Sequence, residues 1–167
     1  EAVKLPGAVD PASYRVGAGD GLQLTLWGGV SRTMPMEGTP EGTILLPTSG
    51  PLHVEGKLLS DVRKEVLTRL RPEFRGVNMD LQLIRPRQFI AYMTGQVKMP
   101  GSVTANGASR VADLVLAAEP LEGASLRNIE LIHKDGTREV ADLELFLRTA
   151  SQSLNPWLRD GDMIHVP

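Results

Sequence analysis

The stretch Tyr14-Arg15-Val16-Gly17-Ala18-Gly19-Asp20-Gly21-Leu22-Gln23-Leu24-Thr25-Leu26-Trp27 decides how the first half of this chain folds. The glycines and the aspartate at residues 17–21 predict a tight turn, because glycine readily adopts the positive φ angles that such turns need. Leucine then occupies every second position, a period of two that predicts a half-buried strand. A second Gly-Asp turn followed by a strand closes the chain, at Gly161-Asp162-Met163-Ile164-His165-Val166.

The remainder of the first half predicts short strands around one helix. Ser60 is a favoured capping residue for the start of that helix, and Pro72 ends it. Between these two residues, valine and leucine recur about every four positions, which is the period of a helix with one buried face. Residues 1–13 show no period and predict an extended arm. The predicted strands are 22–26, 43–46, 52–54 and 77–83.

The stretch from Gly28 to Gly42 is predicted to be a long loop. It is polar and contains Gly29, Gly38 and Pro40. Loops of this length are uncommon in a small domain, and they are often functional or mobile.

The strand–helix–strand pattern starts again after Arg85-Pro86-Arg87, which predicts a boundary between two domains, 1–86 and 87–167. Ser109 is the predicted cap of the second helix, and Pro120 is its predicted end. Asp135-Gly136 predicts a type I′ hairpin turn. The other predicted elements are strands at 89–94, 102–105, 128–133, 137–141 and 163–166 and a short helix at 142–149.

These elements predict an α+β fold made of two small units, each with short strands around one helix. Hairpin-type connections outnumber strand–helix–strand crossovers, which argues against a doubly wound parallel sheet.

Composition excludes several classes of protein. The chain has 167 residues, of which 41% are hydrophobic, and its formal net charge is -2, so it lacks the basic footprint of a nucleic-acid-binding domain. It has no cysteine, so this sequence contains no disulfide, no thiolate nucleophile and no cysteine to which a lipid anchor could be attached, and a signal, anchor or membrane helix is expected to have been removed. No apolar run approaches the ~20 residues of a membrane-spanning helix, and the start does not read as a signal peptide. We expect that the sequence is a mature or trimmed portion.

The residue types that carry catalysis or bind metals are scattered. His53, His133 and His165 have no metal-ligand spacing, and each is predicted to be a surface or hydrogen-bonded histidine. Asp160 and Asp162 are predicted to cap a turn, because the other ligands of a calcium loop are missing. We therefore predict no catalytic residue, no metal site and no cofactor.

Trp27 is predicted to be a packing or interface residue, because the strand alternation places it on the face opposite the leucines.

Three further motifs follow in order after the opening stretch: Gly42-Thr43-Ile44-Leu45-Leu46-Pro47-Thr48-Ser49-Gly50, Val54-Glu55-Gly56-Lys57, and Gly95-Gln96-Val97 with Pro100-Gly101. With the closing Gly-Asp strand, this order resembles the bacterial polysaccharide export family of Wza type. The resemblance implies a polysaccharide export domain in the first half and one soluble-ligand-binding β-grasp (SLBB) domain in the second. One departure is Ala118-Glu119-Pro120, where the family usually has Ala-Gly-Gly. A second SLBB domain and a membrane-spanning helix, found in larger members, are also absent from this sequence.

The resemblance implies a non-enzymatic role in the export of capsular or extracellular polysaccharide. The expected assembly is a homo-oligomeric ring in the periplasm, associated with the outer membrane, that forms a conduit for the polysaccharide chain. An inner-membrane copolymerase, often with a tyrosine kinase domain, is the expected partner. The loop between Gly28 and Gly42 would then line the passage, with Ser31, Arg32, Thr33 and Glu37 as hydrogen-bonding candidates and Trp27 as an interface candidate; an ordinary surface loop is the alternative.

Two other functions stay open on the sequence. The chain is alternatively a stand-alone SLBB module that binds a carbohydrate or small ligand as a monomer, and ring assembly would separate this from the conduit. A polysaccharide hydrolase or lyase ranks last, because no paired carboxylates are evident.

Overall fold

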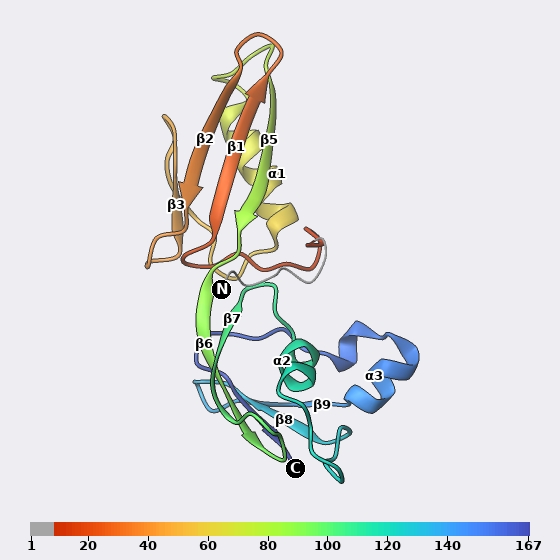
Figure 1. Cartoon of the computed structure of the whole chain (residues 1–167). Helices are drawn as coiled ribbons and strands as arrows, with labels where there is room; N and C mark the ends of the chain where they lie inside the picture. The colour runs from red at the N-terminus through yellow and green to blue at the C-terminus, as the bar shows by residue number, and fades with distance from the viewer. Residues whose placement is uncertain (1–8) are drawn as a thin grey trace. The chain divides into compact units, whose positions relative to one another are not determined.

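The computed structural model describes residues 9–167, which form two compact units, Val9–Arg87 and Gln88–Pro167 (Figure 1). Each unit combines open sheets with helices, so the predicted α+β class is confirmed. Residues 1–8 of the predicted arm lie outside the described part of the chain. Each unit is described by itself below.

The first unit is built on a three-stranded antiparallel sheet with β1 (Gly21–Trp27) at its centre. β2 (Arg32–Glu37) pairs with one edge of β1, and β5 (Asn78–Arg85) pairs with the other. The three leucines of β1 are almost fully buried, whereas the residues between them are more exposed. The period of two in the sequence therefore predicts this strand correctly, to within one residue at each end.

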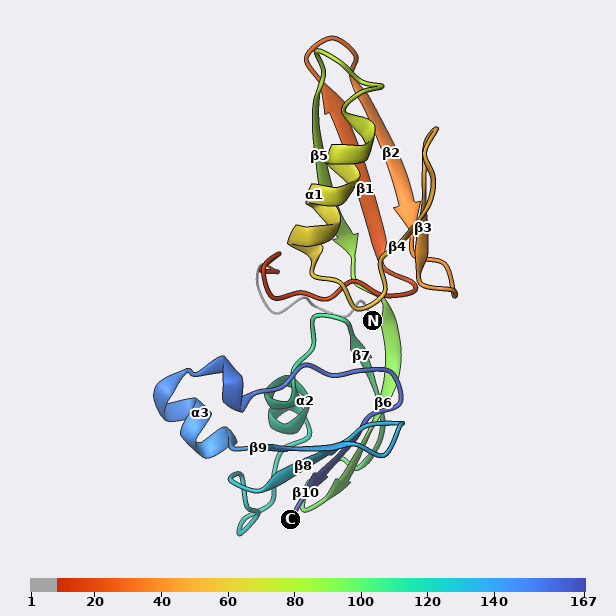
Figure 2. The same ribbon diagram turned by 180° about the vertical axis from the view of Figure 1, so that it is seen from behind.

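The helix α1 (Leu59–Leu70) covers one face of this sheet, lying behind it in Figure 1 and in front of it in Figure 2. The prediction that Ser60 caps the helix is wrong, because the cap residue is Leu58, two residues earlier, and it makes no side-chain cap hydrogen bond. Backbone carbonyls satisfy the first N–H groups instead: Leu59 N–H donates to Tyr14 O at 2.8 Å and Ser60 N–H to Pro11 O at 2.9 Å. Backbone carbonyl groups of the segment before β1 thus replace a capping side chain.

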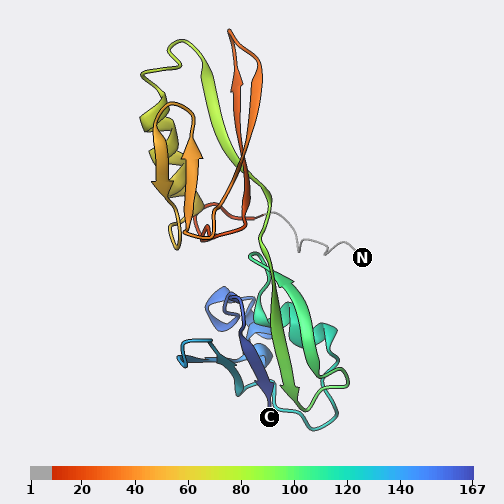
Figure 3. The same ribbon diagram turned by 90° about the vertical axis from the view of Figure 1, so that its left-hand side faces the viewer.

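The strands β3 (Thr43–Leu46) and β4 (Gly50–His53) form a separate antiparallel hairpin in this unit, seen apart from the three-stranded sheet in Figure 3. The first strand has its predicted bounds. The second begins earlier than predicted, at Gly50.

The second unit contains a five-stranded sheet in the order β7-β6-β10-β8-β9. The last strand of the chain lies at its centre, parallel to β6 and antiparallel to β8. Every predicted strand of this half is present, with ends shifted by at most a residue or two. The strands are β6 (Gln88–Gly95), β7 (Gly101–Asn106), β8 (Ile129–Ile132), β9 (Arg138–Ala141) and β10 (Met163–Val166).

The helices α2 (Val111–Ala117) and α3 (Leu143–Thr149) lie on one side of this sheet in Figures 1 and 2, and a short 3-10 turn, Gln152–Leu154, follows them. The predicted cap Ser109 is wrong by one residue, because Arg110 takes that position and its N–H donates to Asp113 Oδ2 at 2.8 Å. None of the helices within residues 9–167 has the length and apolar character needed to cross a membrane. Apolar residues of the sheet and helices form one core, including Met93, Val111, Val115, Ile129, Leu131, Leu143, Ile164 and Val166.

The turn between β8 and β9 differs from the predicted type I′ form. That form needs positive φ at both central residues, but only Gly136 has it, at 88°. Gly136 N–H donates to His133 O at 2.9 Å, and Thr137 N–H donates to Asp135 Oδ1 at 2.9 Å. The side chain of Asp135 therefore organises a turn in which a single glycine makes the left-handed step.

The predicted long loop is also wrong in part, because β2 occupies Arg32–Glu37. Met36 is buried and Met34 half-buried, opposite Leu22 and Leu24 of β1. Pro35, which cannot donate a ladder hydrogen bond, lies on an edge strand where proline is tolerated. The polar composition of residues 28–42 predicts a loop, because this edge strand contributes only two side chains to the core.

Candidate functional site

The two Gly-Asp turns have the same internal structure. In the first, Gly17 N–H donates to Asp20 Oδ2 at 2.8 Å, and Asp20 N–H donates back to Gly17 O at 3.2 Å. In the second, Arg159 and Asp162 make the same two bonds, at 2.7 and 3.1 Å. Both aspartates are fully buried. The aspartate three residues into each turn therefore closes it and starts the strand that follows, which confirms the capping role predicted for Asp162.

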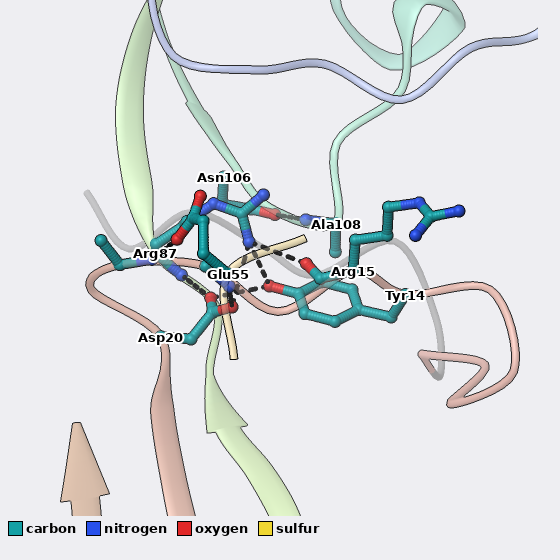
Figure 4. Close-up of polar contacts among 9 residues, drawn as sticks. Tyr14, Arg15, Asp20, Glu55, Arg87, Asn106 and Ala108 are labelled. Carbon is teal, nitrogen blue, oxygen red and sulfur yellow. Dashed lines mark hydrogen bonds and ion pairs between the residues drawn. The ribbon is translucent and has the colours of Figure 1, made fainter. Parts of the chain in front are cut away.

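The buried carboxylate of Asp20 also joins the opening stretch of the first unit to Arg87 at its end (Figure 4). Its Oδ1 accepts hydrogen bonds from the Tyr14 hydroxyl and from Arg87 N–H, both at 2.7 Å, and its Oδ2 forms an ion pair with Arg87 Nη1 at 3.0 Å. Arg87 Nη1 also lies 3.2 Å from the Tyr14 hydroxyl and 3.1 Å from Arg15 O. Asp20 therefore holds the end of the first unit against the turn that begins its central strand.

Tyr14 stays protonated in this cluster. Burial raises the pKa of Tyr14 far above its usual value, and the neighbouring Asp20 carboxylate raises it further. Gly17 leaves room for the arginine, because a Cβ at that position would lie 3.1 Å from the Arg87 guanidinium. This arrangement is a structural anchor around the fully buried Asp20 carboxylate.

In the second turn, Asp162 Oδ1 lies 2.8 Å from His133 Nδ1, and His133 Nε2 lies 3.1 Å from Glu139 Oε1. Burial alone lowers the pKa of His133, but the hydrogen bonds with Asp162 and Glu139 outweigh it and raise the pKa above 6.5. Burial raises the pKa of Asp162 as well, against the hydrogen bonds from His133 and Arg159 N–H that lower it. The prediction of a hydrogen-bonded histidine is confirmed for His133. No set of three metal-ligating side chains is placed to hold an ion within residues 9–167.

The structure separates the residues predicted to line a passage. Ser31, Arg32 and Thr33 are exposed at the start of β2, next to the end of β1, where Trp27 is 46% exposed. Glu37 lies at the other end of β2, 3.4 Å from Arg85 Nη2. Glu37 is four positions after Thr33, a rise of about 13 Å along the strand. One end of the sheet therefore carries Trp27, Ser31, Arg32 and Thr33, and Glu37 lies at the other end.

Trp27 is on the face of the sheet that α1 does not cover, as the strand alternation predicts. Thr25, which lies on the same face, is opposite Thr33 on β2 and Asp80 on β5, and Asn78 is opposite Trp27. The face therefore combines one exposed aromatic ring with hydroxyl and amide groups, whereas the Asp80 carboxylate is paired with Arg63 of α1. The contribution of β5 was missed, because the sequence shows its polar alternation but not the strand with which it pairs.

Comparison with known proteins finds a family match for the first unit and two similar proteins. Residues 8–83 match the model of the polysaccharide biosynthesis/export protein family, which covers nearly all of the first unit. Two curated proteins of Escherichia coli, each named polysialic acid transport protein KpsD, are 26% and 25% identical to this chain over 156 residues. These alignments cover 92% of the chain but only 28% of each relative, so the chain spans little more than a quarter of their length. The first unit therefore matches the polysaccharide biosynthesis/export protein family, and the chain as a whole is similar to two proteins named for polysialic acid transport.

Proposed function

We propose that this chain is a component of a channel that exports capsular or extracellular polysaccharide. The observation that carries the proposal is the family match over the first unit, which includes the first Gly-Asp turn and the whole of β1. Further support comes from the two relatives named for polysialic acid transport, whose similarity extends over 92% of the chain. The role is passage of a polymer without making or breaking bonds.

The proposal assigns the second unit to the SLBB β-grasp class. Support comes from its topology, in which the closing strand β10 inserts between β6 and β8 and runs parallel to β6. The full-length protein is proposed to form a closed ring of identical subunits in the periplasm, associated with the outer membrane and docked to an inner-membrane copolymerase. A closed ring of this kind uses two different faces of each subunit.

Contact with the sugar chain is proposed for the uncovered face of the first sheet near the end of β1. Trp27 offers an apolar ring face, and Ser31 and Thr33 offer hydroxyl groups. These groups are exposed to solvent, so each contact with a sugar is weak. Weak, repeated contacts suit a polymer that has to slide.

Complementation of a strain that lacks the gene tests this assignment. The double substitution Trp27→Ala with Thr33→Ala is expected to lower the amount of surface polysaccharide several-fold while thermal unfolding followed by circular dichroism stays unchanged. The matched control is Tyr92→Ala with Thr104→Ala, which removes an equally exposed aromatic residue and a threonine from the second unit. Normal export by the Trp27 variant, or an equal loss in the control, would argue against a sugar-contacting role of this face.

Sedimentation of the full-length protein tests the ring, which predicts a single closed oligomer at high concentration. A protein that remains monomeric there contradicts the conduit and favours a ligand-binding module.

A further inference from the structure

The far end of the first unit brings together segments that are distant in sequence. β1 ends there, β2 and β5 begin there, and α1 ends there (Figure 2). The strand register places Leu26 opposite Arg32 and Trp27 opposite Asn78, so the β1–β2 turn lies beside the chain that leaves α1. Residues 27–32 and 71–78 therefore form one end of the molecule's first unit.

This end carries three exposed arginines: Arg32 at the start of β2, Arg71 at the C-terminal cap of α1, and Arg75 in the α1–β5 connection. We call these three residues the arginine tip. Glu73 is the one acidic residue in the two connecting segments. Positive charge therefore collects at this end of a chain whose net charge is -2.

The arginines of the tip differ from the other arginines of the first unit in lacking partners. The five others each contact an acidic side chain or a carbonyl oxygen: Arg15, Arg63, Arg69, Arg85 and Arg87. The side chains of the arginine tip make no ion pair or hydrogen bond within residues 9–167. Packing does not explain them, because all three are exposed.

The geometry of the tip suits a polymer with repeated negative charges. Arg32 is opposite the buried Leu26, so it projects on the face of the sheet that α1 covers, the side on which Arg71 ends the helix. Strands β2 and β5 are separated by β1, so the start of β2, which carries Arg32, lies roughly 10 Å from the start of β5, into which the connection with Arg75 leads. Guanidinium groups bind carboxylates through two parallel hydrogen bonds, and each exposed pair is weak and screened by salt.

We propose that the arginine tip binds an acidic polysaccharide whose sugars carry carboxylate groups, an inference that rests on the proposed export function. Trp27 and Asn78 lie at the same end of the unit but project from the opposite face of the sheet, so the tip contacts the polymer through its guanidinium groups. Charge complementarity selects the acidic polymer, and the weakness of each exposed ion pair lets the polymer move across the tip.

The test compares two triple variants of the 167-residue chain. Arg32→Gln, Arg71→Gln and Arg75→Gln remove the tip. Arg127→Gln, Arg138→Gln and Arg148→Gln are the control, because they remove three exposed arginines of the second unit that already have acidic partners. Both variants therefore change the net charge equally.

The probe is fluorescently labelled soluble polysialic acid, with neutral dextran in parallel, and binding is measured by fluorescence anisotropy at low and at high salt. We expect the tip variant to weaken polysialic acid binding by about tenfold, since three exposed ion pairs of a few-fold each multiply, and the control to change it by less than about twofold. We also expect binding to weaken as salt rises and dextran to be indifferent to the substitutions.

Equal losses in both variants, no loss in the tip variant, or absence of binding by the unaltered chain would overturn the proposal. Tighter binding of the tip to phosphatidylglycerol vesicles than to polysialic acid would also overturn it, because it assigns the tip to a membrane surface. Failure of this proposal can be distinguished from failure of the proposed export function by complementation. If deletion of the gene abolishes surface polysaccharide and the tip variant restores it, the export function is supported and the role of the arginine tip is rejected.

Discussion

At the scale of single residues, two buried aspartates organise the units of this chain. Each closes a turn through one carboxylate oxygen and binds a distant side chain, so one side chain connects local and long-range structure. Asp20 connects Tyr14 with Arg87, and Asp162 connects a turn with His133. A buried carboxylate in this position is stabilising only while its partners are present.

Asp20→Ala is expected to lower the free energy of unfolding of the first unit by about 3 kcal/mol, because it leaves the Arg87 guanidinium and the Tyr14 hydroxyl without their acceptor. Hydrogen exchange of peptides from residues 9–87 in increasing urea measures the change. The exposed Asp160→Ala serves as the control and is expected to change stability by no more than about 0.5 kcal/mol. Similar effects of the two substitutions would contradict the role of the anchor.

The second unit is expected to lose stability as the pH rises above 6.5. The pKa of His133 is raised in the folded state, so folding favours the imidazolium. The resulting stabilisation is complete at pH values below the pKa of His133 in the unfolded chain, and it is lost as the pH rises past the higher pKa of His133 in the folded state. The pKa of Asp162 is also raised in the folded state, so this group likewise lowers the stability of the second unit as the pH rises above its ordinary pKa of 3.8. Urea unfolding followed by Trp157 fluorescence in a Trp27→Phe background, at about pH 6 and about pH 8.5, measures the difference.

His133→Gln removes the titrating group and is expected to abolish most of the pH dependence between these two values. A pH dependence that survives this substitution would assign the effect to other groups.

At the scale of elements, the β1–β2 hairpin depends on the geometry of its turn. Gly28 has a φ of 102°, where other residues are strained, and a Cβ there would lie 2.9 Å from Asn78 Nδ2. Gly29 has open space around its Cα and does not have a positive φ. The two adjacent glycines therefore have different structural roles, although the sequence presents them as a pair.

Gly28→Ala is expected to destabilise the first unit by about 1–2 kcal/mol, because the alanine has to adopt an unfavourable backbone conformation and displace Asn78. Gly29→Ala is the matched control and is expected to be neutral or slightly stabilising, since it restricts the unfolded chain. Urea unfolding followed by circular dichroism measures both. The structure of the turn is contradicted if the two variants have the same stability.

The free edge of β5 is protected against pairing with another strand. Leu81 O accepts a hydrogen bond from Arg63 Nε at 2.9 Å, and Leu81 N–H donates to Asp80 Oδ1 at 2.9 Å. Arg63 and Asp80 are also an ion pair. Side chains thus occupy backbone groups that would otherwise invite strand addition.

At the scale of the whole molecule, each unit contains its own buried core. The core residues of the second unit all lie between Phe89 and Val166, and the Asp20 anchor ends the first unit at Arg87. A unit with its own core can in principle fold alone.

The fragment Gln88–Pro167 is therefore expected to fold by itself. Its central strands β6, β8 and β10 should show the same protection from hydrogen exchange as in the entire chain. The fragment Val9–Arg87 is the reciprocal sample and is expected to unfold cooperatively as well. Loss of protection in the isolated second unit would contradict a domain boundary between Arg87 and Gln88.

The sequence by itself determined the elements whose side chains alternate between core and solvent. The three leucines of β1, the apolar positions of α1 and α2, and the bounds of β3 and β10 could all be predicted, because burial imposes a local period on the side chains. Positive φ at Gly19 and Gly161 could also be predicted from glycine in a tight turn.

Only the tertiary structure decided which distant groups meet. Asp20 and Arg87 are 67 residues apart, and the backbone of Pro11 and Tyr14 replaces the capping side chain predicted for α1. The strand β2 forms because pairing with β1 satisfies its backbone and buries Met36, although its polar composition predicts a loop. The arginine tip likewise exists only because the hairpin and the end of α1 meet. Local periodicity indicates whether a side chain is buried. It does not indicate which distant residue that side chain contacts, because strand and helix pairing depend on the packing and hydrogen bonding of the whole unit.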